Sequence, residues 1–115
     1  MAFAQNRGRA GEALAAAYLE MVGCRILARN TRLAGVEVDL LVEDGGTQVL
    51  VEVRARSRPD YGGAAQSVDF RKRQRLLQAA RAIEAGAGRV RIDVVALDVH
   101  ADGVALTHFR SAVTG

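Results

Sequence analysis

The clearest pattern of apolar and polar positions lies between residues 35 and 56, where it predicts a β-hairpin. Two runs rich in valine and leucine flank an Asp-Gly-Gly sequence, which favours a tight turn. Side chains of a strand alternate between its two faces. In the first run this alternation places Glu37 and Asp39 on one face, and the residues expected on the other face are apolar: Val36, Val38, Leu40 and Val42. The second run carries charged residues on one face in the same way.

The position of the turn sets which side chains meet across the hairpin. A two-residue turn at the two glycines would place Asp39 opposite Glu52, and Glu37 opposite Arg54. A turn shifted back by one residue would instead pair Glu37 with Glu52. Both registers gather the four charged side chains on one face, where facing carboxylates repel each other. Either a divalent cation held by carboxylate oxygens or ion pairs with arginines would offset this repulsion, and the spacing alone does not choose between them.

Two segments have the apolar spacing of amphipathic helices. The first runs from about residue 9 to residue 22, after a lead at 1–8 that we expect to be flexible. Its predicted apolar stripe is Leu14, Tyr18, Met21 and Val22, widened by Ala15, Ala16 and Leu19. The second helix is predicted at 67–85, after a loop at 57–66, and Lys72 falls inside its apolar stripe. A lysine there can lay its alkyl chain over apolar surface and bring its ammonium group to the end of the sheet.

Three further segments are predicted to be strands, at 24–33, 90–99 and 104–110. The second is a nearly continuous apolar run, typical of an interior strand covered on both faces, and the third suits a short edge strand. Asp93 lies inside the apolar run and needs a partner, for which we expect an arginine. The order α-β-β-β-α-β-β predicts one α/β domain over 1–115, with a central mixed sheet flanked by helices.

Composition limits the classes of function. The chain has 115 residues, 50% of them hydrophobic, which suffices for one folded core. No apolar run reaches the length of a membrane span and the first residues lack the apolar core of a signal peptide, so we expect a cytoplasmic protein without membrane contact. Cys24 is the only cysteine, so neither an internal disulfide nor a zinc cluster is expected. The net charge of +3 mildly favours polyanionic partners.

The charged hairpin, with Glu-Val-Asp-Leu-Leu-Val followed by Val-Glu-Val-Arg-Ala-Arg, resembles the signature of the PD-(D/E)xK nucleases. This superfamily includes restriction endonucleases and Holliday junction resolvases. Over nearly its whole length the chain is similar to one branch, the uncharacterised YraN-like proteins of bacteria. That similarity also rests on Gly-Arg-Ala-Gly-Glu-Ala-Leu in the first helix, Phe-Arg-Lys-Arg-Gln-Arg-Leu in the second and Arg-Ile-Asp-Val-Val in the fourth strand. The resemblance implies a restriction-endonuclease-like fold.

The resemblance also implies a DNA endonuclease that depends on Mg²⁺ or Mn²⁺. Carried over by position, Asp39 and Glu52 would bind the metal ion together with the backbone carbonyl of Val53. Glu12 matches an acid of the first helix that helps to hold metal or water in resolvase-like relatives. Glu37 matches a further acid beside the site.

One departure from the signature concerns its lysine, because the chain has Arg54 at that position. A guanidinium group stabilises negative charge, but its pKa is too high for it to act as a base. Lys72 is the only lysine of the chain and is the candidate to supply the missing amine from the second helix. We therefore expect this amine close to Glu52 or Asp39; the alternative is a lysine that only solvates the end of its helix.

Several arginines are expected to contact the phosphates of nucleic acid, most simply DNA: Arg56, Arg71, Arg73 and Arg75. Three functions stay open at this point. The first is a metal-dependent endonuclease, the second is a nucleic-acid-binding module without catalysis, and the third is a structural adaptor whose acids are merely salt-bridged. The broad apolar surface of the first helix also allows a homodimer contact.

Overall fold

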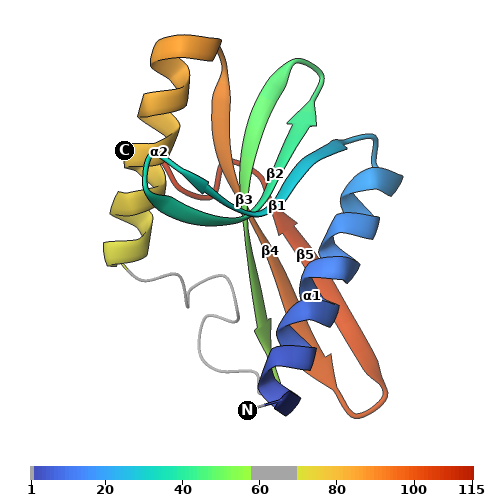
Figure 1. Cartoon of the computed structure of the whole chain (residues 1–115). Coiled ribbons are helices and arrows are strands. Elements are labelled where there is room, and N and C mark those ends of the chain that lie inside the picture. Colours follow the sequence, from blue (N-terminus) through green and yellow to red (C-terminus); the bar gives the residue numbers. More distant parts are fainter. Residues whose placement is uncertain (1, 58–69) are drawn as a thin grey trace.

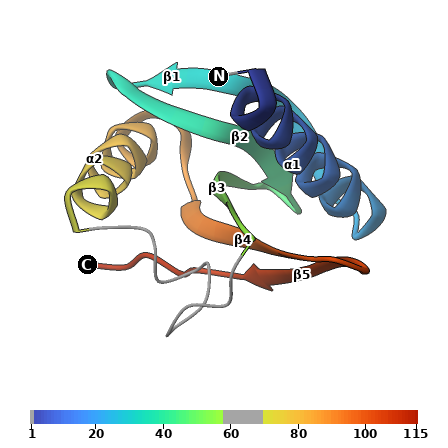
Figure 2. The same cartoon turned by 90° about the horizontal axis from the view of Figure 1, so that it is seen from below.

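The structure, a computed structural model, describes residues 2–57 and 70–115. A five-stranded mixed sheet has one helix on each side (Figures 1 and 2). The predicted α/β class and the order α-β-β-β-α-β-β are confirmed. The elements are α1 (Ala2–Met21), β1 (Arg25–Leu33), β2 (Val36–Asp44), β3 (Thr47–Arg56), α2 (Phe70–Ala87), β4 (Val90–His100) and β5 (Gly103–Phe109). No helix in the described part of the chain is long and apolar enough to cross a membrane.

The strands follow one another across the sheet in the order β1-β2-β3-β4-β5. Neighbouring strands are antiparallel except β3 and β4, which are parallel because the chain returns through α2 between them. β4 lies inside the sheet and is buried over most of its length, whereas β5 forms an edge, as the sequence predicts. The turn between β2 and β3 is the two-residue turn at Gly45 and Gly46, both with positive φ, and it pairs Asp44 with Thr47.

The pairing of β2 with β3 stops earlier than the sequence predicts. It runs from Asp44 back to Leu40, which is opposite Val51, and the first residues of β2 pair only with β1. The predicted backbone pairs of Asp39 with Glu52 and of Glu37 with Arg54 are therefore wrong. In Figure 1, β1 and the start of β2 swing away from β3 toward α2.

The alternation of faces along β2 also changes at Asp39. Leu40 and Val42 pack in the core on the α1 side, whereas Val36 and Val38 pack in the core on the α2 side. The single apolar face predicted for this strand is therefore wrong. The cause is a bend in both strands, because Asn30, at the same level of β1, has a positive φ of 48° that interrupts regular strand geometry.

The helix α1 packs against the sheet through small residues. Gly11 is buried, and a Cβ atom added to it would lie 3.2 Å from Leu97 Cδ1. The other fully buried positions of the helix are Ala15, Ala16 and Leu19. Leu14 and Met21 of the predicted stripe are exposed, because they lie on a different side of the helix from the buried Ala15 and Leu19. Val22 follows the end of the helix and is exposed too.

The helix α1 begins earlier than the sequence predicts and ends where it predicts. The helix begins at Ala2 rather than near residue 9, so residues 2–8, predicted as a lead before the helix, belong to it. It ends as expected before Gly23, whose φ is 101°. Cys24 follows and is buried, and burial raises the pKa of its thiol, in keeping with the inert thiol that single-cysteine usage suggests.

The helix α2 packs on the other face of the sheet with the predicted stripe. Leu76, Ala79 and Ala80 are buried, and Lys72 lies one turn before Leu76 on the same side. Most of the predicted loop at 57–66 and the first residues of the predicted helix at 67–85 lie outside the described residues.

Candidate functional site

The acids Asp39 and Glu52 come together where β2 leaves β3. An Oδ2 atom of Asp39 accepts a hydrogen bond of 2.8 Å from the backbone N–H of Val53, a group that the departing strand no longer pairs. The bend in β2 therefore replaces a strand–strand hydrogen bond with a carboxylate, and it holds that carboxylate beside the next acid along β3. The sequence prediction that these two acids meet is confirmed, although the predicted backbone pairing is not.

An open pocket of about 280 Å³ lies at this point, at the end of β3 and beside the first half of α1. Its wall consists of residues from α1, β2 and β3: Gly8, Gly11, Glu12, Asp39, Glu52, Val53, Arg54 and Ala55. Gly11 brings the helix close to the sheet, which places Glu12 in the wall. The glycines were not predicted as part of the site, although their spacing on one side of a helix that packs on a sheet is a recognisable signal.

Glu52 is the buried acid of this site, only 3% exposed. Burial and the neighbouring negative charge of Asp39 raise the pKa of Glu52 from 4.5 to about 7, against the opposing effects of Arg54 and Lys72. Its Oε2 atom pairs with Arg54 Nη2 at 2.8 Å, whereas its Oε1 atom is buried and accepts no hydrogen bond. A buried carboxylate oxygen without a hydrogen bond is costly, and the ammonium group of Lys72, 3.8 Å from Oε1, offsets part of this cost.

The expected approach of Lys72 to the acids is confirmed. Its Nζ atom lies 3.8 Å from Glu52 Oε1 and donates a hydrogen bond of 2.9 Å to the backbone carbonyl of Glu37. The second contact links α2 to the part of β2 that has left the sheet. The amine of the second helix thus reaches the pocket beside Arg54, which occupies the motif position.

The side chain of Glu37 does not belong to the site. It is exposed and pairs with Arg32 at 3.2 Å, outside the pocket. The prediction that it shares a face with Asp39 and Glu52 is wrong, because it assumed unbroken alternation along a strand that bends at Asp39. Only the backbone carbonyl of Glu37 meets a site residue.

The four arginines predicted to contact nucleic acid differ in the exposure of their side chains. Those on the first two turns of α2 are exposed: Arg71, Arg73 and Arg75. Arg56 is the last residue of β3 and is half-buried. The three arginines of α2 are therefore exposed on the helix that carries Lys72.

The donor groups of the pocket fit a divalent cation that prefers oxygen ligands. Among residues 8–57 and 70–115, no group of three or more acidic, histidine or cysteine side chains is arranged to hold a metal ion. Two carboxylates and a backbone carbonyl remain as the donor set: those of Asp39, Glu52 and Val53. The N–H and C=O of a strand residue point toward the same neighbouring strand, so the Val53 carbonyl faces the side from which Asp39 approaches. The oxygen of Glu52 without a donor completes a set that suits Mg²⁺.

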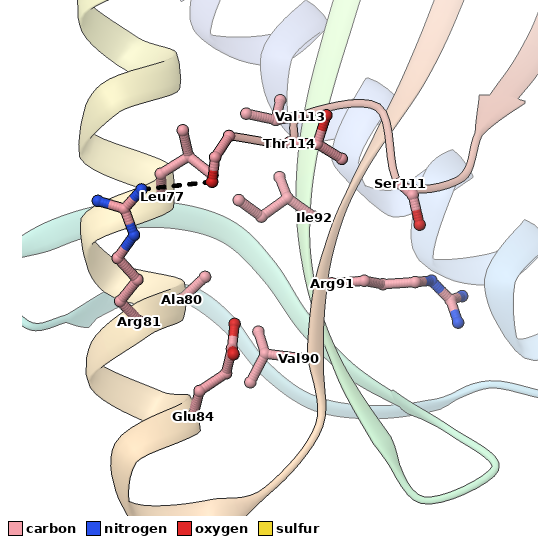
Figure 3. Close-up of a pocket in the computed structure, with 11 residues that line it drawn as sticks. Leu77, Ala80, Arg81, Glu84, Val90, Arg91, Ile92, Ser111, Val113 and Thr114 are labelled. Carbon is pink, nitrogen blue, oxygen red and sulfur yellow. Dashed lines mark hydrogen bonds between the residues drawn. The ribbon is translucent and has the colours of Figure 1, made fainter.

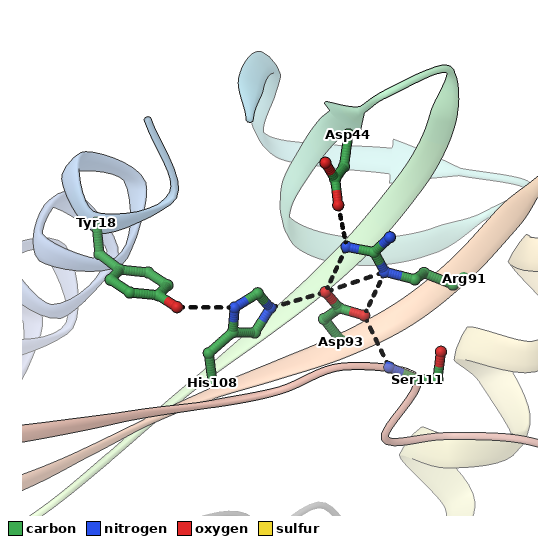
Figure 4. Close-up of polar contacts among 6 residues, drawn as sticks. All are labelled: Tyr18, Asp44, Arg91, Asp93, His108 and Ser111. Carbon is green, nitrogen blue, oxygen red and sulfur yellow. Dashed lines mark hydrogen bonds and ion pairs between the residues drawn. The ribbon is translucent and has the colours of Figure 1, made fainter. Parts of the chain in front are cut away.

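A second polar cluster lies on the α1 side of the sheet, centred on Asp93 (Figure 4). The carboxylate of Asp93 is 1% exposed and accepts hydrogen bonds from Arg91 Nε at 3.0 Å, His108 Nε2 at 2.8 Å and the backbone N–H of Ser111 at 3.0 Å. The predicted arginine partner of Asp93 is confirmed. Arg91 could be predicted as this partner, because it lies two residues from Asp93 and therefore on the same face of the strand. No sequence signal points to His108.

This cluster continues to α1 and to the tip of the hairpin. The hydroxyl of Tyr18 lies 3.0 Å from His108 Nδ1, within hydrogen-bonding distance. Arg91 also donates to Asp44 at 2.7 Å, and this hydrogen bond holds the pKa of Asp44 below its usual value. The cluster joins α1, β2, β4 and β5 through the contacts drawn in Figure 4, and none of its members has a buried side-chain atom that lacks a hydrogen bond, which indicates a structural role.

Another pocket, of about 240 Å³, lies between α2, β4 and the C-terminal residues (Figure 3). Its lining is mainly apolar, and Arg81 closes one side by donating to the carbonyl of Gly115 at 3.4 Å. None of the predicted site residues lines it. The predicted site residues Asp39, Glu52 and Arg54 line the first pocket, and Lys72, which is not part of its wall, contacts Glu52.

The fold and the first pocket define a class of small α/β proteins with an acid pair at the point where two strands of a mixed sheet diverge. The chain belongs to the family described as "Uncharacterised protein family UPF0102", whose model matches residues 11–97. A UPF0102 protein of Halorhodospira halophila is 54% identical over 97 residues, which cover 84% of this chain and 80% of that protein. A UPF0102 protein of Stutzerimonas stutzeri is 41% identical over 117 residues, which cover 97% of this chain and 98% of the relative.

A comparison with solved structures gives a more distant similarity. The structure of Pyrococcus furiosus SfsA in complex with Ca²⁺ aligns with 93% of this chain and 63% of that one, with a TM-score of 0.49 and 16% identity. At that level it adds nothing to the argument about the site.

Proposed function

We propose that this chain is a metal-dependent nuclease domain of the PD-(D/E)xK type, which binds cytoplasmic nucleic acid, most simply DNA, and hydrolyses its phosphodiester bonds. Asp39, Glu52 and the carbonyl of Val53 hold a divalent cation, Mg²⁺ or Mn²⁺. When bound, the cation stabilises charge on the scissile phosphate and lowers the pKa of a water molecule. The observation that carries this proposal is the buried Glu52 carboxylate beside Asp39, with one oxygen lacking a donor.

The cationic residues of the pocket complete the proposed site. The side chain of Arg54 is 33% exposed, lines the pocket and pairs with Glu52, and in the proposed complex it contacts the scissile phosphate. The ammonium group of Lys72, 3.8 Å from Glu52, offsets negative charge beside the acid pair and supplies the amine that the motif position lacks. Exposed arginines of α2 contact the flanking phosphates without reading base sequence.

A second candidate is a nucleic-acid-binding domain that keeps this fold without catalysis. A specific observation favours it: Arg54 sits on Glu52 at 2.8 Å, in the place where a cation would bind an acid. In that case the guanidinium group substitutes permanently for the metal ion. The two candidates share the nucleic-acid surface and differ in metal binding.

Metal binding is tested by titrating Mg²⁺ and Mn²⁺ into the purified protein in a calorimeter. We expect binding by the wild type and its loss in Asp39→Asn and in Glu52→Gln. Glu37→Gln is the matched control, because Glu37 is an exposed carboxylate two residues from Asp39 that faces Arg32, and it should bind metal as the wild type does. Equal binding by all three variants would place any cation elsewhere.

Cleavage is then tested on labelled DNA with Mn²⁺ present. Products that form with the wild type and vanish in Glu52→Gln support the nuclease. Nucleic-acid binding without metal binding or cleavage supports the second candidate. Absence of both metal binding and nucleic-acid binding would contradict both proposals and leave the salt-bridged adaptor.

A further inference from the structure

Phe70 is exposed at the start of α2, close to the pocket. Its side chain is 75% exposed, and neither of the two apolar cores includes it. A single exposed apolar residue needs no explanation by itself. The position of this one is informative because two exposed arginines, Arg71 and Arg73, flank it on the helix.

The contacts of Lys72 fix where the first turn of α2 lies relative to the pocket. Lys72 reaches Glu52 and the carbonyl of Glu37, so the first turn of α2 is anchored at the acid pair. The Cα atoms of residues two apart in a helix are separated by about 5 Å. Side chains two residues apart point to nearly opposite sides of a helix, so the phenyl ring stands on the solvent side of the same turn that carries Lys72 to the acid pair.

The surface around the ring is positively charged. Arg73 is three residues from Phe70 and so neighbours it on the helix, and Arg71 is adjacent in sequence; both are exposed. An aromatic ring between guanidinium groups is the arrangement with which proteins bind single-stranded nucleic acid, since bases stack on the ring and phosphates meet the cations. A duplex offers the cations its phosphates but keeps its base faces stacked inside.

We propose that Phe70 is a stacking platform for an unpaired base on the exposed side of α2, so that the substrate class is nucleic acid with single-stranded character where it crosses this helix beside the site. This inference rests on the proposed function for the binding of nucleic acid at this site. Arg71 and Arg73 hold the backbone on either side of the stacked base, and Phe70 selects for unpaired over paired nucleotides.

The chain contains no tryptophan, so Phe70→Trp introduces a single fluorescent reporter at the proposed platform. The variant is titrated in EDTA with a short oligothymidylate, an oligouridylate and a blunt duplex of the same length. We expect quenching by the single strands and little quenching by the duplex. The two single strands distinguish DNA from RNA. Without metal no cleavage interferes, so failure here is separate from failure of the calorimetric test of the metal site.

Met21→Trp is the matched control, because Met21 is 86% exposed at the far end of α1 and should show no quenching by any of the three. Anisotropy with labelled oligothymidylate should show about tenfold weaker binding by Phe70→Ala, with affinity retained by Phe70→Tyr. Equal quenching by duplex, or unchanged affinity of Phe70→Ala, overturns the proposal. Fluorescence of Phe70→Trp that changes with protein concentration alone also overturns it, in favour of a contact between copies of the chain.

Discussion

One carboxylate, Glu52, determines much of the chemistry at the level of residues. Its burial is unfavourable for the charged form, and Asp39 adds a second negative charge beside it. Arg54 and Lys72 only partly offset both effects. A residue kept in such an environment costs stability in the absence of a ligand, as groups of functional sites often do.

The pKa of Glu52 predicts how stability depends on pH. Its folded-state value of about 7 lies above the ordinary 4.5, so the folded protein holds the proton more tightly than the unfolded chain does. The free energy of unfolding therefore falls as pH rises from about 4.5 to about 7. Glu52→Gln should remove much of this fall and be more stable than the wild type near pH 8, by no more than about 3 kcal/mol.

Urea denaturation of the metal-free proteins across this pH range measures the effect. Glu43→Gln is the control, since Glu43 pairs with Arg25 at the surface and its loss should change stability by less than about 1 kcal/mol at any pH. Parallel pH profiles for the wild type and Glu52→Gln would show that the carboxyl group is not destabilised by its surroundings.

The two cations beside Glu52 should have separable roles. Lys72→Ala should abolish cleavage with Mn²⁺ while leaving nucleic-acid affinity largely intact, because one ammonium group among several cations adds little to binding. Arg54→Lys should preserve or raise the rate, since it restores an amine at the motif position. Rates and affinities measured on the same DNA test this. Normal cleavage by Lys72→Ala would reduce that residue to a link between α2 and the Glu37 carbonyl.

At the level of elements, the sequence predicted the hairpin, the strand order and the Lys72 stripe, because alternation, glycine turns and helical spacing act locally. It failed where geometry depends on distant contacts. The face of α1 was misjudged because Leu14 and Met21 are more hydrophobic than the alanines, whereas the short distance to the sheet selects small residues. The bend at Asp39 follows from Asn30 on the neighbouring strand, and no pattern within β2 itself reveals it.

The close packing of α1 leads to a prediction about two glycines. Gly11→Ala places a methyl group 3.2 Å from Leu97, whose side chain is fully packed, so the helix must shift at the turn that carries Glu12. We expect a loss of stability of about 1 kcal/mol or more, with weakened metal binding. Gly86→Ala, in α2, has no atom within 4 Å of the new methyl group and should gain up to about 1 kcal/mol. Thermal unfolding compares the two. A gain in both variants would show that α1 tolerates the added methyl group.

For the whole molecule, charge is spread unevenly rather than strongly. The net charge is only +3, and several arginines of the hairpin are compensated: Arg25 by Glu43 and Arg32 by Glu37. The exposed arginines Arg71, Arg73 and Arg75 lie on the turns of α2 around Lys72 and have no such partner among the ion pairs of the described residues. Affinity for a polyanion therefore depends on one end of α2.

This distribution predicts a local origin for the salt dependence of nucleic-acid binding. Replacing Arg71 and Arg75 together with alanine should lower the slope of log affinity against log salt by about 1.4 for a single strand. Replacing Arg25 and Arg32 together should change it little, because both already face carboxylates. Fluorescence anisotropy at several salt concentrations supplies the slopes. Binding that ignores salt, or equal slopes for the two double variants, would rule out the α2 surface.

The divergence of β2 from β3 also divides the molecule into two tiers of local stability. The residues of β2 before Leu40 share backbone hydrogen bonds with β1 alone, so this two-stranded arm can open while the sheet from β3 to β5 stays closed. Its amide protons should then exchange with solvent well before those of β4. Such an opening also carries the Glu37 carbonyl away from Lys72. Any ligand that orders the acid pair and the lysine should therefore slow hydrogen exchange along the arm, at amides that the ligand never touches.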